Sequence, residues 1–157
     1  MTDADDACPC HSTPLAMSDL IGCWKLVAAL WERNGEIVAN PNLADPTGYL
    51  HYLAEGRVAV TIALAGRKPM SGTHRRTAPR DELAESALTF DAYAGTFSLP
   101  GADTVVHHIE ISSYQNDVGK DLVRHAVLEG DRLSLYPVEF QDDGRRWLVW
   151  ERVPLPR

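Results

Sequence analysis

The chain has 157 residues, of which 45% are hydrophobic and 24% are charged, and its 15 basic and 22 acidic side chains leave a net charge of −7. This composition is typical of a globular chain, and at this length one domain forms a core without disulfides or a structural metal. Nucleic-acid binding is not indicated, because it needs a clustered basic face and the densest basic segment, residues 67–76, is short and loop-like. A membrane span is not indicated either, since no apolar stretch approaches about 18–20 residues.

The first 18 residues contain Pro9 and Pro14 and show no hydrophobic periodicity. We therefore expect a flexible tail over 1–18 and a single domain over 19–157. The acidic N-terminus lacks the basic and apolar regions of a secretory signal, which predicts a cytoplasmic protein. Cys8, Cys10 and His11 form a C-x-C-H pattern without the two-residue gap usual in zinc and redox sites, so we expect no metal.

From Leu20 onward, short apolar segments alternate with turn residues about every ten positions, a pattern typical of an antiparallel sandwich or barrel. Asn34-Gly35 predicts a type I′ hairpin, because both residues tolerate the positive φ that this turn requires. We expect strands near 22–33, 36–39, 47–53, 57–64, 94–99, 104–112, 121–128, 132–138 and 146–153.

One segment departs from the strand pattern and predicts a single helix near 80–92. Pro79, Asp81 and Glu82 have the chemistry of a first helical turn, and the apolar residues that follow share one face. Gly95 is expected to end this helix shortly after Tyr93.

The two ends of the expected domain carry a recognisable pair of motifs. Gly22-Cys23-Trp24 opens the first long strand, and Trp150-Glu151-Arg152-Val153 closes the last. With the segments 48–57, 93–95, 104–112 and 118–119 in the same order, the chain resembles the lipocalin-like domain family of small bacterial and fungal proteins over about 20–153. The resemblance implies an all-β fold, an antiparallel lipocalin-like (calycin-type) β-barrel of eight to ten strands, with Arg152 in a cation–π contact on Trp24 at the barrel base.

Turn geometry predicts which side chains face the interior of the first half. A three-residue loop after Leu53 places Gly56 in the left-handed conformation and pairs Tyr52 with Val58. The inward row is then made up of Leu50, Tyr52, Val58, Val60, Ile62 and Leu64.

Alternation on 104–112 puts Val105, His107, Ile109 and Ile111 in an apolar row that we expect to face inward. His107 is then either a core histidine with satisfied ring nitrogens or a titratable group in the cavity. His108 and Glu110 are expected to face solvent.

Two later strands leave their orientation open. On 121–128, either the row with Arg124 or the row with His125 faces inward, and an inward Arg124 would anchor an anion. On 146–153, Trp147 and Trp150 lie on opposite rows; the family resemblance favours Leu148, Trp150 and Arg152 inward.

No nucleophile motif of the Gly-x-Ser-x-Gly or His-Glu-x-x-His type occurs, so covalent hydrolysis is not indicated. We expect a barrel that binds a small hydrophobic metabolite, as a monomer or homodimer, and works as a cofactor-free isomerase or cyclase of secondary metabolism. His107 and Tyr52 are the expected catalytic pair. The expected ligand-binding residues are Trp150, Leu148, Leu50, Val60, Ile62, Ile109, Arg124 and Tyr93.

Two alternatives stand beside catalysis. The first is a carrier of a hydrophobic ligand, and the second is an interaction module whose barrel is filled by its own side chains. Convergence of His107 and Tyr52 on one point in the cavity would favour chemistry, whereas isolated, satisfied groups would favour a carrier.

Overall fold

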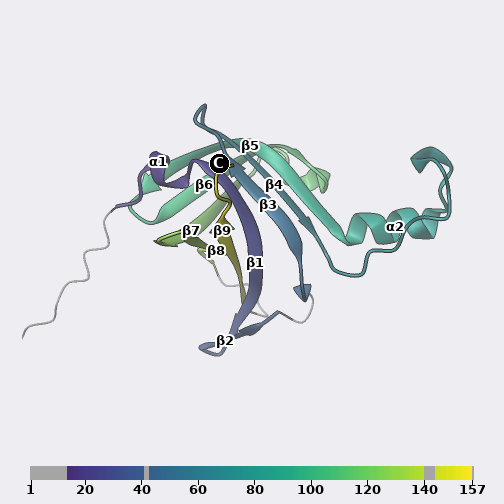
Figure 1. Cartoon of the computed structure of the whole chain (residues 1–157), viewed down its shortest axis with the longest axis horizontal. Coiled ribbons are helices and arrows are strands. Elements are labelled where there is room, and N and C mark those ends of the chain that lie inside the picture. Colours follow the sequence, from purple (N-terminus) through teal and green to yellow (C-terminus); the bar gives the residue numbers. More distant parts are fainter. Residues whose placement is uncertain (1–13, 41–42, 140–143, 157) are drawn as a thin grey trace, which may run out of the picture.

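The computed structural model describes residues 14–40, 43–139 and 144–156 and shows an antiparallel β-barrel (Figure 1). Its nine strands form one sheet in the order β2-β1-β3-β4-β5-β6-β7-β8-β9, and β1 also pairs with β9. This second pairing closes the barrel and leaves β2 outside it as a short extension of β1. The predicted all-β antiparallel barrel is therefore confirmed.

The elements lie close to their predicted positions. The strands are β1 (Gly22–Arg33), β2 (Glu36–Ala39), β3 (Thr47–Tyr52), β4 (Arg57–Ala63), β5 (Phe90–Gly101), β6 (Thr104–Ser112), β7 (Asp121–Glu129), β8 (Arg132–Pro137) and β9 (Arg145–Arg152). The helices are α1 (Met17–Leu20) and α2 (Arg80–Leu88), with 3₁₀ turns η2 (Arg75–Thr77) and η3 (Gln115–Asp117).

The two turns that set the register of the first strands form as expected. Asn34 and Gly35 have φ values of 51° and 80° between β1 and β2. Gly56 has φ 79°, and Tyr52 pairs with Val58 across β3 and β4. Both turns therefore match the backbone that their residues favour, and the predicted inward row of β3 and β4 is buried from Leu50 to Ile62.

The predicted helix near 80–92 is too long, because α2 ends at Leu88 and β5 begins at Phe90. Phe90 pairs with Ala63 and Tyr93 with Val60 of β4, and aromatic residues gain more from a packed sheet than from a solvated helix end. Gly95 lies inside β5, where an added Cβ would stand 1.8 Å from the carbonyl oxygen of His108. This glycine permits close approach of two strands instead of ending a helix.

The expected inward orientation of Ile111 is also wrong, since its side chain is 65% exposed. Gly95 pairs with Ile109 and Ala94 with Ile111, which leaves Glu110 as an extra residue on β6. Such a bulge reverses the alternation of side chains beyond it. Val105, His107 and Ile109 lie before the bulge and keep their buried positions.

The short helix α1 was not predicted, and it covers one end of the barrel. Residues 1–13, including Cys8, Cys10 and His11, lie outside the described residues. From Leu15 onward the chain contacts the barrel: the Leu15 N–H donates to the carbonyl of Ala102, and Leu15 packs against the core. The division into a tail at 1–18 and a domain at 19–157 remains a prediction.

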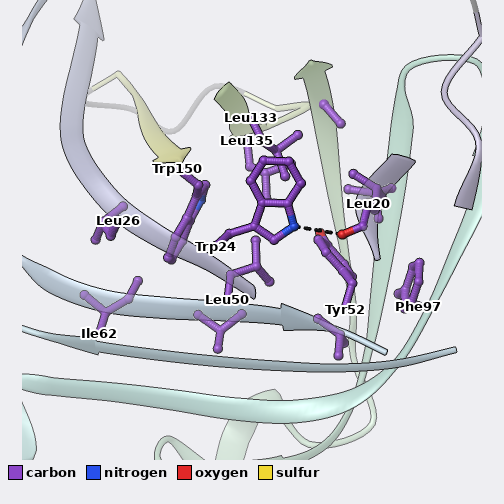
Figure 2. Packing of buried hydrophobic residues seen from close by; sticks show 14 residues of the cluster. Leu20, Trp24, Leu26, Leu50, Tyr52, Ile62, Phe97, Leu133, Leu135 and Trp150 are labelled. Carbon is purple, nitrogen blue, oxygen red and sulfur yellow. Dashed lines mark hydrogen bonds between the residues drawn. The ribbon is translucent and has the colours of Figure 1, made fainter. Parts of the chain in front are cut away.

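The closed end of the barrel is built around Trp24 (Figure 2). Its indole N–H donates to the carbonyl of Leu20 at 2.8 Å, and both residues are fully buried. Leu133 and Leu135 from β8 and Leu50 from β3 belong to the same hydrophobic cluster. This packing fills the base, so that any cavity has to lie nearer the opposite end.

At that opposite end, α2 and the loop before it extend away from the sheet (Figure 1). None of the α2 residues is buried. Within the described ranges, no helix is long and apolar enough to cross a membrane.

Candidate functional site

A cavity of about 140 Å³ lies inside the barrel beyond the Trp24 base. The apolar part of its walls comes from β3, β4, β7, β8 and β9, with the lining residues Leu50, Val60, Ile62, Leu122, Leu135, Pro137, Leu148 and Trp150. Six polar or charged residues complete the lining: Asp91, Tyr93, His107, Asp117, Arg124 and Arg146. A concave pocket that combines apolar walls with placed polar groups is the usual form of a small-molecule site.

Most of the expected site residues lie on this cavity. The ones that line it are His107, Trp150, Leu148, Leu50, Val60, Ile62, Arg124 and Tyr93. Tyr52 and Ile109 are buried in the wall of the barrel and do not line it. The functional roles of these residues remain proposals, but their grouping follows from the strand register described above.

The sequence reasoning missed six of the lining residues. Leu122 shares a row with Arg124, and Leu135 and Pro137 share one on β8, so strand alternation could have found them. Asp91 was placed in the expected helix, and Asp117 lies in η3, where alternation gives no signal. Arg146 is on the inward row of β9 with Leu148.

The two open choices of strand face are resolved. On β7 the row with Leu122 and Arg124 faces the cavity, whereas His125 faces outward and packs on Tyr136 with ring centroids 5.2 Å apart. On β9 Trp150 lines the cavity, and Trp147 stacks on Tyr136 outside the barrel at 3.8 Å. The orientation of β9 agrees with the one favoured by the family resemblance.

His107 forms the centre of a buried hydrogen-bonded chain. The Tyr52 hydroxyl lies 2.7 Å from its Nε2, and the Tyr93 hydroxyl lies 2.9 Å from its Nδ1. The three residues come from β3, β6 and β5, and His107 is only 1% exposed. Both ring nitrogens are therefore engaged, and the Tyr52 hydroxyl is directed at the ring instead of at a shared point in the cavity.

Burial shifts the titration of each member of this chain. Loss of solvation lowers the pKa of His107 to about 3, with smaller contributions in the same direction from Arg124 and His108. Burial raises the pKa of Tyr93 to about 12 and that of Tyr52 well above its ordinary value. At neutral pH the chain therefore consists of a neutral imidazole between two neutral phenols.

Two groups on the cavity wall are polar but incompletely partnered. The Trp150 indole N–H is buried and has no acceptor among the described residues. The Arg124 guanidinium donates through Nη1 to the backbone carbonyl of Val123 at 3.0 Å, and it forms no salt bridge with a carboxylate in the described part of the chain. Desolvation lowers the pKa of Arg124.

The cavity opens at the end of the barrel where α2 leaves the sheet. Ile62, Asp91, Asp117 and Arg146 line both the cavity and an adjoining groove of about 640 Å³ that reaches Leu88 and Tyr114. The Asp117 carboxylate accepts from Lys120 at 3.0 Å. Asp91, Asp117 and Arg146 therefore mark the mouth of the cavity, whereas Arg124 lines the cavity and, with Arg146, a second groove of about 460 Å³.

A separate cluster on the outer face has the connectivity of a catalytic triad. The Ser98 hydroxyl lies 2.8 Å from Nε2 of His108, whose Nδ1 is 2.6 Å from the Asp121 carboxylate. These residues lie on neighbouring strands and face away from the barrel cavity, and Asp121 is largely exposed. We interpret the cluster as a cross-strand polar ladder that supports the sheet.

Metal binding has no geometric support in the part of the chain that the structure describes, where no group of three or more His, Cys, Asp or Glu side chains could hold an ion. Cys23 has its Sγ 3.4 Å from Nε2 of His51 on the outer surface, and burial raises the pKa of the Cys23 thiol. A raised thiol pKa disfavours the reactive thiolate.

Comparison with known proteins adds two findings. A family model described as a lipocalin-like domain matches residues 21–153. The 4'-hydroxy-3'-methoxypropiophenone carrier protein ppsC of Aspergillus oryzae is 32% identical in an alignment of length 100, and the match covers 57% of this chain and 85% of that protein.

Proposed function

Because this chain belongs to the lipocalin-like domain family, we propose that it is a non-catalytic carrier that holds a small, mainly apolar ring compound in its barrel cavity. The ligand enters at the end where α2 leaves the sheet and rests against Trp150 and Leu148. The barrel shields it from water and releases it unchanged.

The state of His107 is the observation that carries this proposal. A general base needs a ring nitrogen within reach of the substrate proton, but Tyr52 and Tyr93 occupy both nitrogens of His107. A pKa of about 3 also makes the ring a weak base. His107 and Tyr52 therefore satisfy each other, which is the arrangement expected of a carrier.

The size of the cavity supports a ligand with one ring. A cavity of about 150 Å³ in another protein holds benzene, and the cavity here measures about 140 Å³. Substituents on such a ring would extend into the adjoining groove. The Aspergillus carrier, whose name gives an aromatic ketone with one ring as its ligand, is consistent with this size.

The test is a titration of the purified chain with 4'-hydroxy-3'-methoxypropiophenone. Binding is measured by the quenching of tryptophan fluorescence and, separately, by calorimetry. Val60→Phe fills the cavity, whereas Val127→Phe makes the same change on the outer face, where Val127 is 39% exposed. We expect Val60→Phe to weaken binding at least about tenfold and Val127→Phe to leave it unchanged. Since overpacking costs about 1–3 kcal/mol, thermal melts must show that both variants are folded.

Binding that is equally strong in both variants would place the ligand outside the barrel and overturn the proposal. Mass spectrometry of the recovered ligand provides a second check. Unchanged ligand supports a carrier, and conversion by the wild type would contradict it.

Catalysis by a cofactor-independent isomerase or cyclase is the second candidate, and the Tyr52–His107–Tyr93 chain is the observation that favours it. Tyr93 lines the cavity and is bonded to His107, so a proton leaving Tyr93 could be replaced through the ring. In that case Tyr93→Phe and His107→Gln would each slow turnover by about 10²–10⁴. Conversion of a ligand by the wild type together with this loss would establish the enzymatic alternative.

A further inference from the structure

The cavity holds one buried hydrogen-bond donor without an acceptor and one cation without a carboxylate partner in the described part of the chain. The Trp150 side chain is 1% exposed, and its N–H has no acceptor among the described residues. Arg124 brings a positive charge to the same cavity without a carboxylate partner in the described ranges. Buried donors and buried charges are costly when unpaired, so a ligand that supplies the missing acceptor would be strongly favoured.

A third donor follows from the direction of the hydrogen bonds around His107. The neutral ring has one N–H and one acceptor nitrogen, so one tyrosine donates to the ring and the other accepts from it. Tyr52 is fully buried, does not line the cavity and has its only described hydrogen bond to Nε2. If Nε2 carried the proton, the Tyr52 O–H would be a buried donor without an acceptor.

In the opposite tautomer Nδ1 of His107 carries the proton, and the Tyr52 O–H is not left without an acceptor. The Tyr52 O–H then donates to Nε2, and Nδ1–H donates to the Tyr93 oxygen. The Tyr93 O–H is left free on the cavity wall, where a ligand can accept it. Tyr52 thus directs Tyr93, which lines the cavity, to act as a donor.

From these three donors we infer that the barrel binds its ligand as an oxyanion, and that the ligand is a phenol held as its phenolate. This inference rests on the proposed carrier function and specifies the ligand for it. Trp150, Tyr93 and Arg124 all line this one cavity, so they are the donors available to the oxygen of a ring bound there. The Arg124 guanidinium gives one N–H of Nη1 to Val123, which leaves other N–H groups of the same side chain for a ligand oxygen.

The surrounding charges are compatible with a bound anion. Asp91 and Asp117 stand at the mouth, where Asp117 is paired with Lys120, and Arg146 adds a second positive charge there. His107 stays neutral and has no free nitrogen. On binding, the phenolic O–H bond therefore breaks with its electron pair left on oxygen, and the proton passes to solvent.

The test uses 4-nitrophenol, whose phenolate absorbs visible light, and its neutral methyl ether 4-nitroanisole as the matched probe. The apparent pKa of 4-nitrophenol is read from its absorbance across a pH series, with and without saturating protein. We expect the bound probe to titrate at least about one unit lower, which is a tenfold preference for the phenolate. Arg124→Gln and Tyr93→Phe should each reduce that preference while 4-nitroanisole still binds.

Arg132→Gln removes the same charge from an exposed salt bridge to Glu151 on the outer face and serves as the control. Tyr93→Phe keeps the test valid if Arg124→Gln fails to fold. Equal binding of both probes with an unshifted pKa would overturn the phenolate inference and leave the carrier proposal standing. Binding of neither probe would count against both.

Discussion

Arg152 lies over the indole ring of Trp24, with its Cζ 4.1 Å from the ring centroid. The same guanidinium donates through Nη1 to the carbonyl of Ile21 at 2.9 Å and through Nη2 to that of Asp19 at 2.6 Å. One side chain of the last strand therefore joins α1 to the first strand. Residues far apart in the sequence close the base of the barrel together.

Arg152→Lys should destabilise the fold by about 1–3 kcal/mol, because an ammonium replaces neither the planar stacking nor the two directed bonds. Urea unfolding measures the loss. Arg132→Lys, at an exposed salt bridge with Glu151, is the matched control and should cost less than about 1 kcal/mol. Similar losses in both variants would mean that the contact with Trp24 contributes nothing specific.

The folded state should lose stability as the pH falls from about 6.5 toward 3, because of His107. In the unfolded chain this residue takes up a proton near its ordinary pKa of about 6.5, whereas the folded ring resists protonation down to about 3. Below pH 6.5 the unfolded state therefore binds more protons, which favours unfolding. The expected contribution between about pH 7 and pH 5 is about 2 kcal/mol.

His107→Gln should flatten this part of the pH profile, and His74→Gln, in an exposed loop, should not. Chemical denaturation at a series of pH values measures the unfolding free energy of both variants and of the wild type. A wild-type profile that matches the His107→Gln profile would show that the ring titrates normally in the folded state.

Gly95→Ala should be among the most damaging small substitutions in the chain. An added Cβ would lie 1.8 Å from the carbonyl oxygen of His108, so the β5–β6 pairing would have to separate at the bulge. We expect a loss of at least about 3 kcal/mol in thermal or urea unfolding.

Gly101→Ala is the matched control, because its Cβ would meet Thr104 no closer than 3.6 Å. A loss under about 1 kcal/mol is expected there. If Gly95→Ala were tolerated equally well, the close approach of β5 and β6 would not constrain the fold.

Local turn chemistry is enough to predict the first half of the barrel. Asn34-Gly35 and Gly56 each require positive φ, so their turns determine the register of the strands beside them. That register directs Leu50 and Tyr52 into the interior, where both side chains are fully buried. The inward position of His107 could also be predicted, because its row with Val105 and Ile109 lies before the bulge and is buried.

Features that depend on pairing between strands could not be predicted from local sequence patterns. The bulge at Glu110 arises from contact between β5 and β6 and turns Ile111 outward. Tyr93 lies in a strand because β4 pairs with it, although the preceding residues favour a helix. The choice of Arg124 over His125 as the inward residue also depends on the neighbouring strands, since both rows of β7 contain apolar residues.

Tyr52→Phe should lower stability more than Tyr93→Phe does and weaken binding less, although each removes one hydroxyl from a nitrogen of His107. With the tautomer inferred above, Tyr52→Phe leaves a deeply buried acceptor nitrogen unpaired and should cost about 1–3 kcal/mol of unfolding free energy. Tyr93→Phe leaves an N–H beside the cavity, where water can reach it, and should cost less.

Affinity for 4-nitrophenol should show the reverse order. Tyr93→Phe removes the donor that faces the ligand and should weaken binding at least about tenfold, whereas Tyr52→Phe should weaken it only a few-fold. Urea unfolding and absorbance titration of the same protein preparations give both quantities. If Tyr52→Phe proved the more harmful to binding and Tyr93→Phe the more harmful to stability, the proton would lie on Nε2 and Tyr93 would not donate to the ligand.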